Sequence, residues 1–215
     1  MKKMNFITGH YGSGKSEFAI NFALSIGAAF LVDLDIVNPY FRTRELEDLC
    51  AENNLRLISS SLTGALGSDL PYIAKEVFLP FYENLTSVFD LGGEAAGARI
   101  VRQFSELLDP QETDFLFCVN CYREETAAPE KIIGMMELIE KSGGFKITGL
   151  INNTNLLRET SYGDLLYGEK ILEELERRTG LRIVYAGVHE KLLPEIGELK
   201  GEIIPLKLYL RKTWL

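Results

Sequence analysis

Short apolar runs alternate along the chain with longer segments in which apolar residues recur at helical spacing. Runs such as "FLV" and "FLFCV" are apolar throughout, as expected of strands that are buried on both faces of a parallel sheet. The pattern predicts seven strands, at residues 4–8, 29–33, 55–59, 87–91, 115–120, 146–152 and 182–186.

The segments between these runs have the pattern of amphipathic helices, at residues 15–26, 43–53, 71–82, 98–108, 128–141 and 162–178. Such regular alternation implies right-handed crossovers between parallel strands, with helices on both faces of the sheet. We therefore predict an α/β fold in three layers, with a doubly wound, mostly parallel sheet of about seven or eight strands. No linker or repeat interrupts the pattern, so residues 1–215 are predicted to form a single domain.

The composition narrows the possible functions. The net charge of −8 and the pI of about 5.0 argue against general nucleic-acid binding. The three cysteines do not make a disulfide framework, and no apolar segment has the length of a secretory signal or a membrane span. We expect a cytoplasmic protein. The alternating apolar residues of "PLKLYL", near the C-terminus, predict a short edge strand or an interface segment and no stable membrane binding.

The stretch "ITGHYGSGKSEF" lies between the first predicted strand and the first predicted helix. Gly9, Gly14, Lys15 and Ser16 match the phosphate-loop pattern G-x-x-x-x-G-K-[ST] in the strand–loop–helix context that this pattern requires. Backbone N–H groups of such a loop surround phosphate oxygens, while the lysine reaches the β- and γ-phosphates and the hydroxyl is suited to bind Mg²⁺. The predicted nucleotide-binding residues of the loop are Gly9, Tyr11, Gly12, Ser13, Gly14, Lys15, Ser16 and Glu17.

Two other predicted strands end in carboxylates. "FLVDLD" ends in Asp33 and Asp35, and "SVFDLGG" places Asp90 shortly before Gly93. Ligands of open parallel sheets bind beyond the carboxyl ends of the strands, so these groups are expected near the phosphate loop. We assign Mg²⁺ binding to Ser16, Asp35 and Asp90, and γ-phosphate contact to the backbone of Gly93. Lys15 and Asp35 are the predicted catalytic residues, with Asp35 placing the attacking water, whereas Asp33 is equally consistent with a structural turn.

The motifs "GHYGSGKS", "VDLDIVNP", "VFDLGG" and "GLINNTN", in this order, resemble the MinD/ParA/nitrogenase-iron-protein group of P-loop NTPases. The resemblance implies Mg-ATP hydrolysis, often with an ATP-dependent homodimer, and it identifies Asn153, with Asn152 beside it, as the base-reading asparagine. Many members of the group carry a second, "signature" lysine at the position of His10. A loop histidine on the surface is the simpler interpretation of His10 in this chain.

Other readings of the same motifs remain open. The strand end at Asp35 also resembles that of P-loop kinases, in which an aspartate accepts the proton of an acceptor hydroxyl and an arginine-bearing lid closes the site. The lid candidates are Arg99, Arg102 and Arg123. The phosphate loop also resembles that of nickel-inserting GTPases, although their histidine-rich and cysteine-rich segments are absent. Cys118 and Cys121 form one C-x-x-C pair, which is a poor metal site without further ligands.

The choice of base follows from the residues after the sixth strand. Guanine-reading P-loop proteins have an N-K-x-D motif, whereas this chain has "NNTN", with Asn155 in the position of the aspartate. The loss of that charged acceptor favours ATP over GTP. We also expect "GVHEKLLPE" to pack on the base, with Val188 as one wall. The sequence thus predicts a Mg-dependent ATPase that acts as a nucleotide-driven switch for an unknown protein partner.

Overall fold

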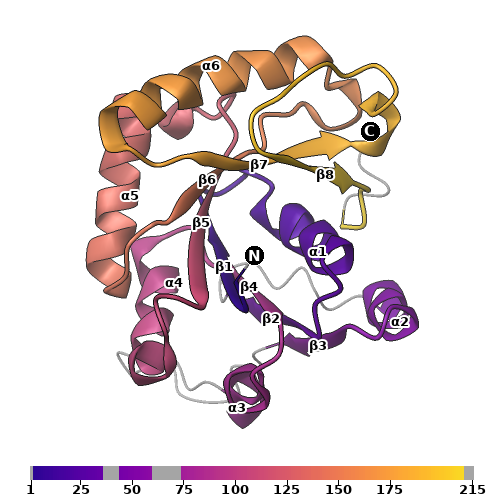
Figure 1. Cartoon of the computed structure of the whole chain (residues 1–215), viewed down its shortest axis with the longest axis vertical. Coiled ribbons are helices and arrows are strands. Elements are labelled where there is room, and N and C mark those ends of the chain that lie inside the picture. The colour runs from indigo at the N-terminus through magenta and orange to yellow at the C-terminus, as the bar shows by residue number, and fades with distance from the viewer. Residues whose placement is uncertain (1, 36–43, 60–73, 211–215) are drawn as a thin grey trace.

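The computed structural model describes residues 2–35, 44–59 and 74–210, which form one eight-stranded sheet. The strand order is β3-β2-β4-β1-β5-β6-β7-β8, and every neighbouring pair is parallel (Figure 1). This confirms the predicted α/β fold with a parallel sheet. The strands are β1 Met4–Thr8, β2 Phe30–Leu34, β3 Arg56–Ser59, β4 Ser87–Leu91, β5 Thr113–Val119, β6 Gly149–Asn152, β7 Ile183–His189 and β8 Glu202–Leu206.

Helices cover both faces of the sheet. The α-helices are α1 Lys15–Ser25, α2 Arg44–Glu52, α3 Leu79–Glu83, α4 Ala95–Arg99, α5 Pro129–Gly143 and α6 Tyr162–Thr179. One apolar cluster joins the sheet to α1 and α2, and a second joins its other face to α4, α5 and α6 (Figure 1). Because β1 lies between β4 and β5 and is buried along its whole length, the loop that follows it starts from a rigid position.

The central strands are held by aromatic packing as well as by the hydrogen bonds of the sheet. The Phe6 ring on β1 stacks on Phe89 of β4 and on Phe115 of β5, with centroid distances of 4.3 and 4.8 Å. Offset stacking of this kind adds about 0.5–1.5 kcal/mol per pair beyond simple burial. The three strands whose carboxyl ends bear on the phosphate loop are therefore fixed to one another from within the core.

Two predicted helices differ from the structure. The helix expected at 98–108 begins at Ala95 and becomes a 3₁₀-helix at Ile100–Leu107. Val101 and Phe104 are buried three residues apart, which places them on one face of a 3₁₀-helix. The helix expected at 71–82 is a 3₁₀ turn at Lys75–Phe78 followed by α3, and its first residues lie outside the described part of the chain.

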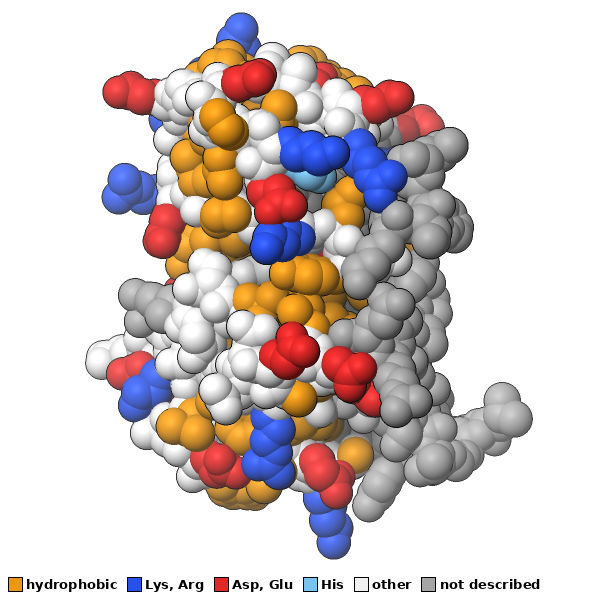
Figure 2. Space-filling model, turned by 90° about the vertical axis from the view of Figure 1, so that its right-hand side faces the viewer, with side chains coloured by type: hydrophobic (Ala, Val, Ile, Leu, Met, Phe, Trp, Pro, Cys, Tyr) orange, Lys and Arg blue, Asp and Glu red, His pale blue; other side chains and the backbone are white. Residues whose placement is uncertain are grey.

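The C-terminal alternation forms the edge strand β8. Ile204 and Leu206 are buried, while Pro205 between them is exposed, consistent with the restriction of proline to sheet edges. In the described ranges no helix combines the length and apolar character needed to cross a membrane. Lys, Arg, Asp and Glu side chains are intermixed on the face in Figure 2, where the described residues form no continuous basic patch.

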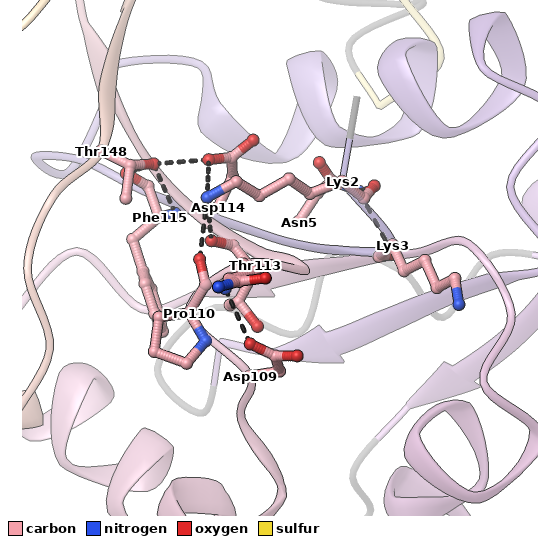
Figure 3. A network of polar contacts seen from close by, with 10 residues as sticks. Lys2, Lys3, Asn5, Asp109, Pro110, Thr113, Asp114, Phe115 and Thr148 are labelled. Carbon is pink, nitrogen blue, oxygen red and sulfur yellow. Dashed lines mark hydrogen bonds and ion pairs between the residues drawn. The ribbon is translucent and has the colours of Figure 1, made fainter.

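A polar network lies at the end of the sheet where the central strands begin (Figure 3). Lys2 Nζ donates to the carbonyl oxygens of Pro110 and Thr113 at 3.0 Å and lies 3.3 Å from the Asp114 carboxylate. Thr148 Oγ1 donates to the same carboxylate at 2.9 Å. These contacts tie the residues before β1 to the start of β5. The candidate site lies at the opposite end of the sheet, beyond the carboxyl ends of the strands.

Candidate nucleotide-binding site

The phosphate loop connects the buried end of β1 to the first turn of α1. Gly14 has a φ of +82° and is the N-cap of α1, so a left-handed residue turns the chain into the helix. The loop after β4 packs against it so closely that a Cβ on Gly93 would lie 2.1 Å from the Gly9 carbonyl oxygen. The structure thus brings Gly93 against Gly9, with the backbone of the loop lying directly against the segment after β4.

Lys15 and Asp35 form a buried ion pair next to this loop. Lys15 Nζ lies 2.9 Å from Asp35 Oδ2, and the two side chains are 7% and 2% exposed. Burial lowers the pKa of Lys15, but the carboxylates of Asp90 and Asp35 together raise this pKa by more than burial lowers it, so the net shift is upward. Lys15 is therefore a fixed positive charge at neutral pH, held at the place where the sequence predicts phosphate binding.

Asp90 is the most unusual group of the site. It is fully buried, and neither carboxylate oxygen makes a hydrogen bond of ordinary geometry with the described residues. Burial raises the pKa of Asp90 to about 7, although the nearby charge of Lys15 and the hydroxyl of Ser16 lower it. Two orphaned carboxylate oxygens beside a hydroxyl form an all-oxygen donor set, which fits Mg²⁺.

Asn153 braces the loop from behind. Its Nδ2 donates to the Ser13 carbonyl oxygen at 2.8 Å, and the thiol of Cys118 approaches the same oxygen at 3.7 Å. The Oδ1 of Asn153 and the hydroxyl of Ser13 are both buried without a partner among the described residues. Asn153 therefore lies at the loop as predicted, but its donor is used by the protein backbone. Whether its oxygen also reads a base stays a prediction.

Three other predicted site residues direct their side chains elsewhere. Asn152 is fully buried, donates to the Leu165 carbonyl oxygen and accepts from the Thr154 N–H, so its amide supports the loop after β6. The Glu17 carboxylate accepts from the backbone N–H groups of Tyr209 and Leu210. The Tyr11 side chain is 57% exposed. For Glu17, whose carboxylate is engaged, only the backbone thus remains as a candidate phosphate contact.

His10 and the two cysteines have structural surroundings. His10 lies in the loop with its side chain 23% exposed, and its Nε2 is 3.8 Å from the exposed Glu125 carboxylate. Cys118 faces Ser13, whereas Cys121 approaches the carbonyl oxygen of Gly168. Burial raises their pKa values to about 12 and about 11, which keeps both thiols protonated.

No group of three or more potential metal-ligating His, Cys, Asp or Glu residues occurs within residues 2–35, 44–59 and 74–210. The thiols of Cys118 and Cys121 are instead engaged with two separate carbonyl oxygens. Over these ranges the cysteine pair therefore behaves as core packing.

A small cavity adjoins the phosphate loop on the side of β6 and β7. Its walls include Gly14, Arg123, Asn153, Asn155, Gly187 and His189. Val188, the expected wall, is fully buried in the core, because alternate residues of a strand point to opposite faces. Arg123, one of the three arginines considered as lid candidates, lines this cavity, whereas Arg99 and Arg102 do not.

A second cavity, of about 730 Å³, opens at the amino-terminal end of the sheet, between the 3₁₀-helix Ile100–Leu107, the end of α5 and the start of β5. Its walls are largely apolar and include the stacked rings of Phe115 and Phe145. Neither the phosphate loop nor the carboxylates of β2 and β4 reach it. Of the two cavities, only the smaller one adjoins the phosphate loop, through Gly12, Gly14 and Asn153.

No family model and no curated protein matches the sequence. Solved structures match the fold at low identity. Cell division protein FtsY from Thermotoga maritima (15% identity, TM-score 0.54) aligns with 88% of this chain and 63% of its own. Chloroplast FtsY from Physcomitrella patens (15% identity, TM-score 0.54) aligns with 88% of this chain and 60% of its own. Signal recognition particle receptor FtsY from Elizabethkingia anophelis in complex with GDP (14% identity, TM-score 0.51) aligns with 87% of this chain and 58% of its own.

This chain spans about three-fifths of the length of these FtsY structures. At such identity the likeness establishes the fold alone, an α/β fold with a parallel sheet as predicted from the sequence.

Proposed function

We propose that this chain is a Mg²⁺-dependent P-loop NTPase that binds ATP and uses its hydrolysis to switch the affinity for a protein partner. The observation that carries the proposal is the convergence of Lys15, Asp35 and Asp90 at the phosphate loop, from the ends of three neighbouring elements. A buried cation and two buried carboxylates form the charge arrangement that a metal-bound polyphosphate requires. FtsY from Elizabethkingia anophelis, which has this fold, was solved in complex with GDP.

In this proposal Lys15 and the backbone N–H groups of residues 12–16 bind phosphate oxygens. Ser16 and Asp90 hold Mg²⁺, which supplies charge neutralisation of the phosphates when it is bound. Asp35 holds Lys15 in place and orients the attacking water. A second copy of this chain is one candidate for the partner, because the MinD/ParA resemblance implies a homodimer.

Asn155 favours ATP over GTP, because it occupies the position of the aspartate that binds guanine in guanine-specific P-loop proteins. Asn155 Nδ2 donates to the Asn153 carbonyl oxygen at 2.6 Å, and its Oδ1 accepts from the Leu157 N–H at 3.1 Å. An uncharged amide that is engaged with its own loop is a weak acceptor for the N1–H and amino group of guanine.

The test is calorimetric titration with Mg-ATP and Mg-GTP, together with measurement of phosphate release. Lys15→Ala is expected to abolish binding or turnover, and Asp35→Ala to slow turnover more than binding. Lys170→Ala removes an exposed lysine of α6 and serves as the matched control. Intact turnover in a folded Lys15→Ala variant would refute the proposal. ADP formed together with a phosphorylated acceptor, in place of free phosphate, would identify a kinase instead.

A further inference from the structure

Arg123 lies across the phosphate loop, in the segment that follows β5. Its Nε donates to the Gly12 carbonyl oxygen at 3.0 Å, and its guanidinium approaches to 3.3 Å the place where a Gly12 Cβ would be. The side chain is exposed, and its two Nη groups have no hydrogen-bond or ion-pair partner in the described part of the chain. Most of the hydrogen-bonding capacity of this guanidinium is therefore available to a ligand.

The cavity next to Arg123 is suited to the base and sugar of a nucleotide rather than to its phosphates. Lys15, Asp35 and Asp90 do not line it, and its walls include the carboxylate-bearing Glu17, which disfavours phosphate there. Leu206 and Leu208 supply an apolar side. If triphosphate occupies the loop at Lys15, the rest of the nucleotide extends toward this cavity.

The cavity is too small for a purine while Arg123 rests on Gly12. Its free volume is about 40 Å³, which is room for about three water molecules. A base must therefore displace part of the wall. Arg123 is the long, exposed side chain of that wall, and a single hydrogen bond to Gly12 is its only side-chain contact of this kind among the described residues.

We propose that Arg123 leaves the Gly12 carbonyl when nucleotide binds and covers the purine ring with its guanidinium plane. A guanidinium is planar and weakly hydrated, and it stacks on aromatic faces better than a lysine ammonium does. Arg123 is then a base-contacting residue whose contribution depends on the purine and not on the phosphates. This inference rests on the proposed function, because it requires a nucleotide in the phosphate loop.

The experiment compares Mg-ATP with magnesium tripolyphosphate, which has the phosphates but no base, by calorimetric titration into wild type, Arg123→Ala and Arg123→Lys. Arg56→Ala is the control, because Arg56 is an exposed arginine at the start of β3 that pairs with Glu83. Arg123→Ala should weaken ATP binding about three- to thirty-fold and leave tripolyphosphate binding unchanged. Arg123→Lys keeps the charge without the plane, so its ATP affinity should fall between those of wild type and alanine variant.

Equal losses for ATP and tripolyphosphate in Arg123→Ala would overturn the inference, because they would assign Arg123 to phosphate binding or to support of the loop through Gly12. Unchanged ATP binding in Arg123→Ala would overturn it as well. Both outcomes leave the proposed function intact, since wild type still binds ATP. Failure of wild type to bind either ligand would instead refute the proposed function, and this inference with it.

Discussion

Replacing Asp90 tests whether this buried carboxylate lowers the free energy of unfolding of the nucleotide-free chain. The change is Asp90→Asn, which keeps the shape of the side chain and removes its ability to ionise. In the folded chain burial raises the pKa of Asp90 from 3.8 to about 7. Between these two pH values the folded state holds a proton that the unfolded state has lost. Stability should therefore fall as the pH rises from about 4 to about 7, and level off above that range.

The magnitude follows from the size of the shift. A displacement of about three pKa units corresponds to about 4 kcal/mol, at 1.36 kcal/mol per unit. Asparagine avoids this cost, which is already a net value that includes the attraction between the ionised carboxylate and Lys15. We expect nucleotide-free Asp90→Asn to be more stable than wild type by about 4 kcal/mol near pH 8, and by only about 1.5–2 kcal/mol near pH 5.

The assay is urea unfolding of the nucleotide-free protein near pH 5 and near pH 8, in wild type and in two variants. Asp35→Asn is the matched control, because Asp35 forms the ion pair with the buried Lys15 and its loss should destabilise by about 3–5 kcal/mol. Adding Mg-ATP should stabilise wild type and have little effect on Asp90→Asn. A loss of stability in Asp90→Asn near pH 8, or a wild-type stability that rises between the two pH values, would refute the reasoning.

Two further predictions concern the elements around the loop. Gly93→Ala places a Cβ 2.1 Å from the Gly9 carbonyl oxygen, so the loops must separate and Mg-ATP binding should weaken by about 1–3 kcal/mol, measured by calorimetry. Gly134→Ala, on α5 with no atom within 4 Å of the added Cβ, is the control and should bind normally. Glu17→Gln weakens charge-assisted bonds to the N–H groups of Tyr209 and Leu210, so limited trypsin cleavage after Lys207 should be about tenfold faster. An unchanged cleavage rate would contradict this role of Glu17.

The positions of the strands could be predicted because a parallel sheet that is buried on both faces leaves a plain sequence signal. β1 and β4 begin and end where their apolar runs do, at Met4–Thr8 and Ser87–Leu91. The 3₁₀-helix at Ile100–Leu107 was not predictable in this way, because a spacing of three residues places apolar side chains on one face of either kind of helix. The close contact of Gly97 with the Cα of Gly92 is a further constraint that no periodicity reports.

The phosphate loop could be predicted because its spacing is local, whereas the partners of its residues come from distant segments. The chain positions of Lys15 and Asp35 indicate that both reach one edge of the sheet, but not that they form an ion pair of 2.9 Å. The sequence also did not indicate that the side-chain donor of Asn153 binds the Ser13 carbonyl oxygen, 140 residues earlier in the chain. Contacts of this kind depend on packing distances of a few tenths of an ångström, which sequence spacing does not encode.

The unsatisfied polar atoms of the fold show where a ligand would contribute most. Of the seven buried side-chain polar atoms that lack a partner in the described residues, five belong to His10, Ser13, Asp90 and Asn153, at or next to the phosphate loop. Each such group costs about 1–3 kcal/mol when it is left unpaired. In the rest of the described chain only Asn5 and Thr113 carry such an atom, so the concentration here is expected of a site built for a ligand rather than for stability. A bound metal would supply positive charge to the Asp90 carboxylate, and a polyphosphate would supply acceptors to the Ser13 hydroxyl. Ligand binding should therefore increase the folding stability of the chain.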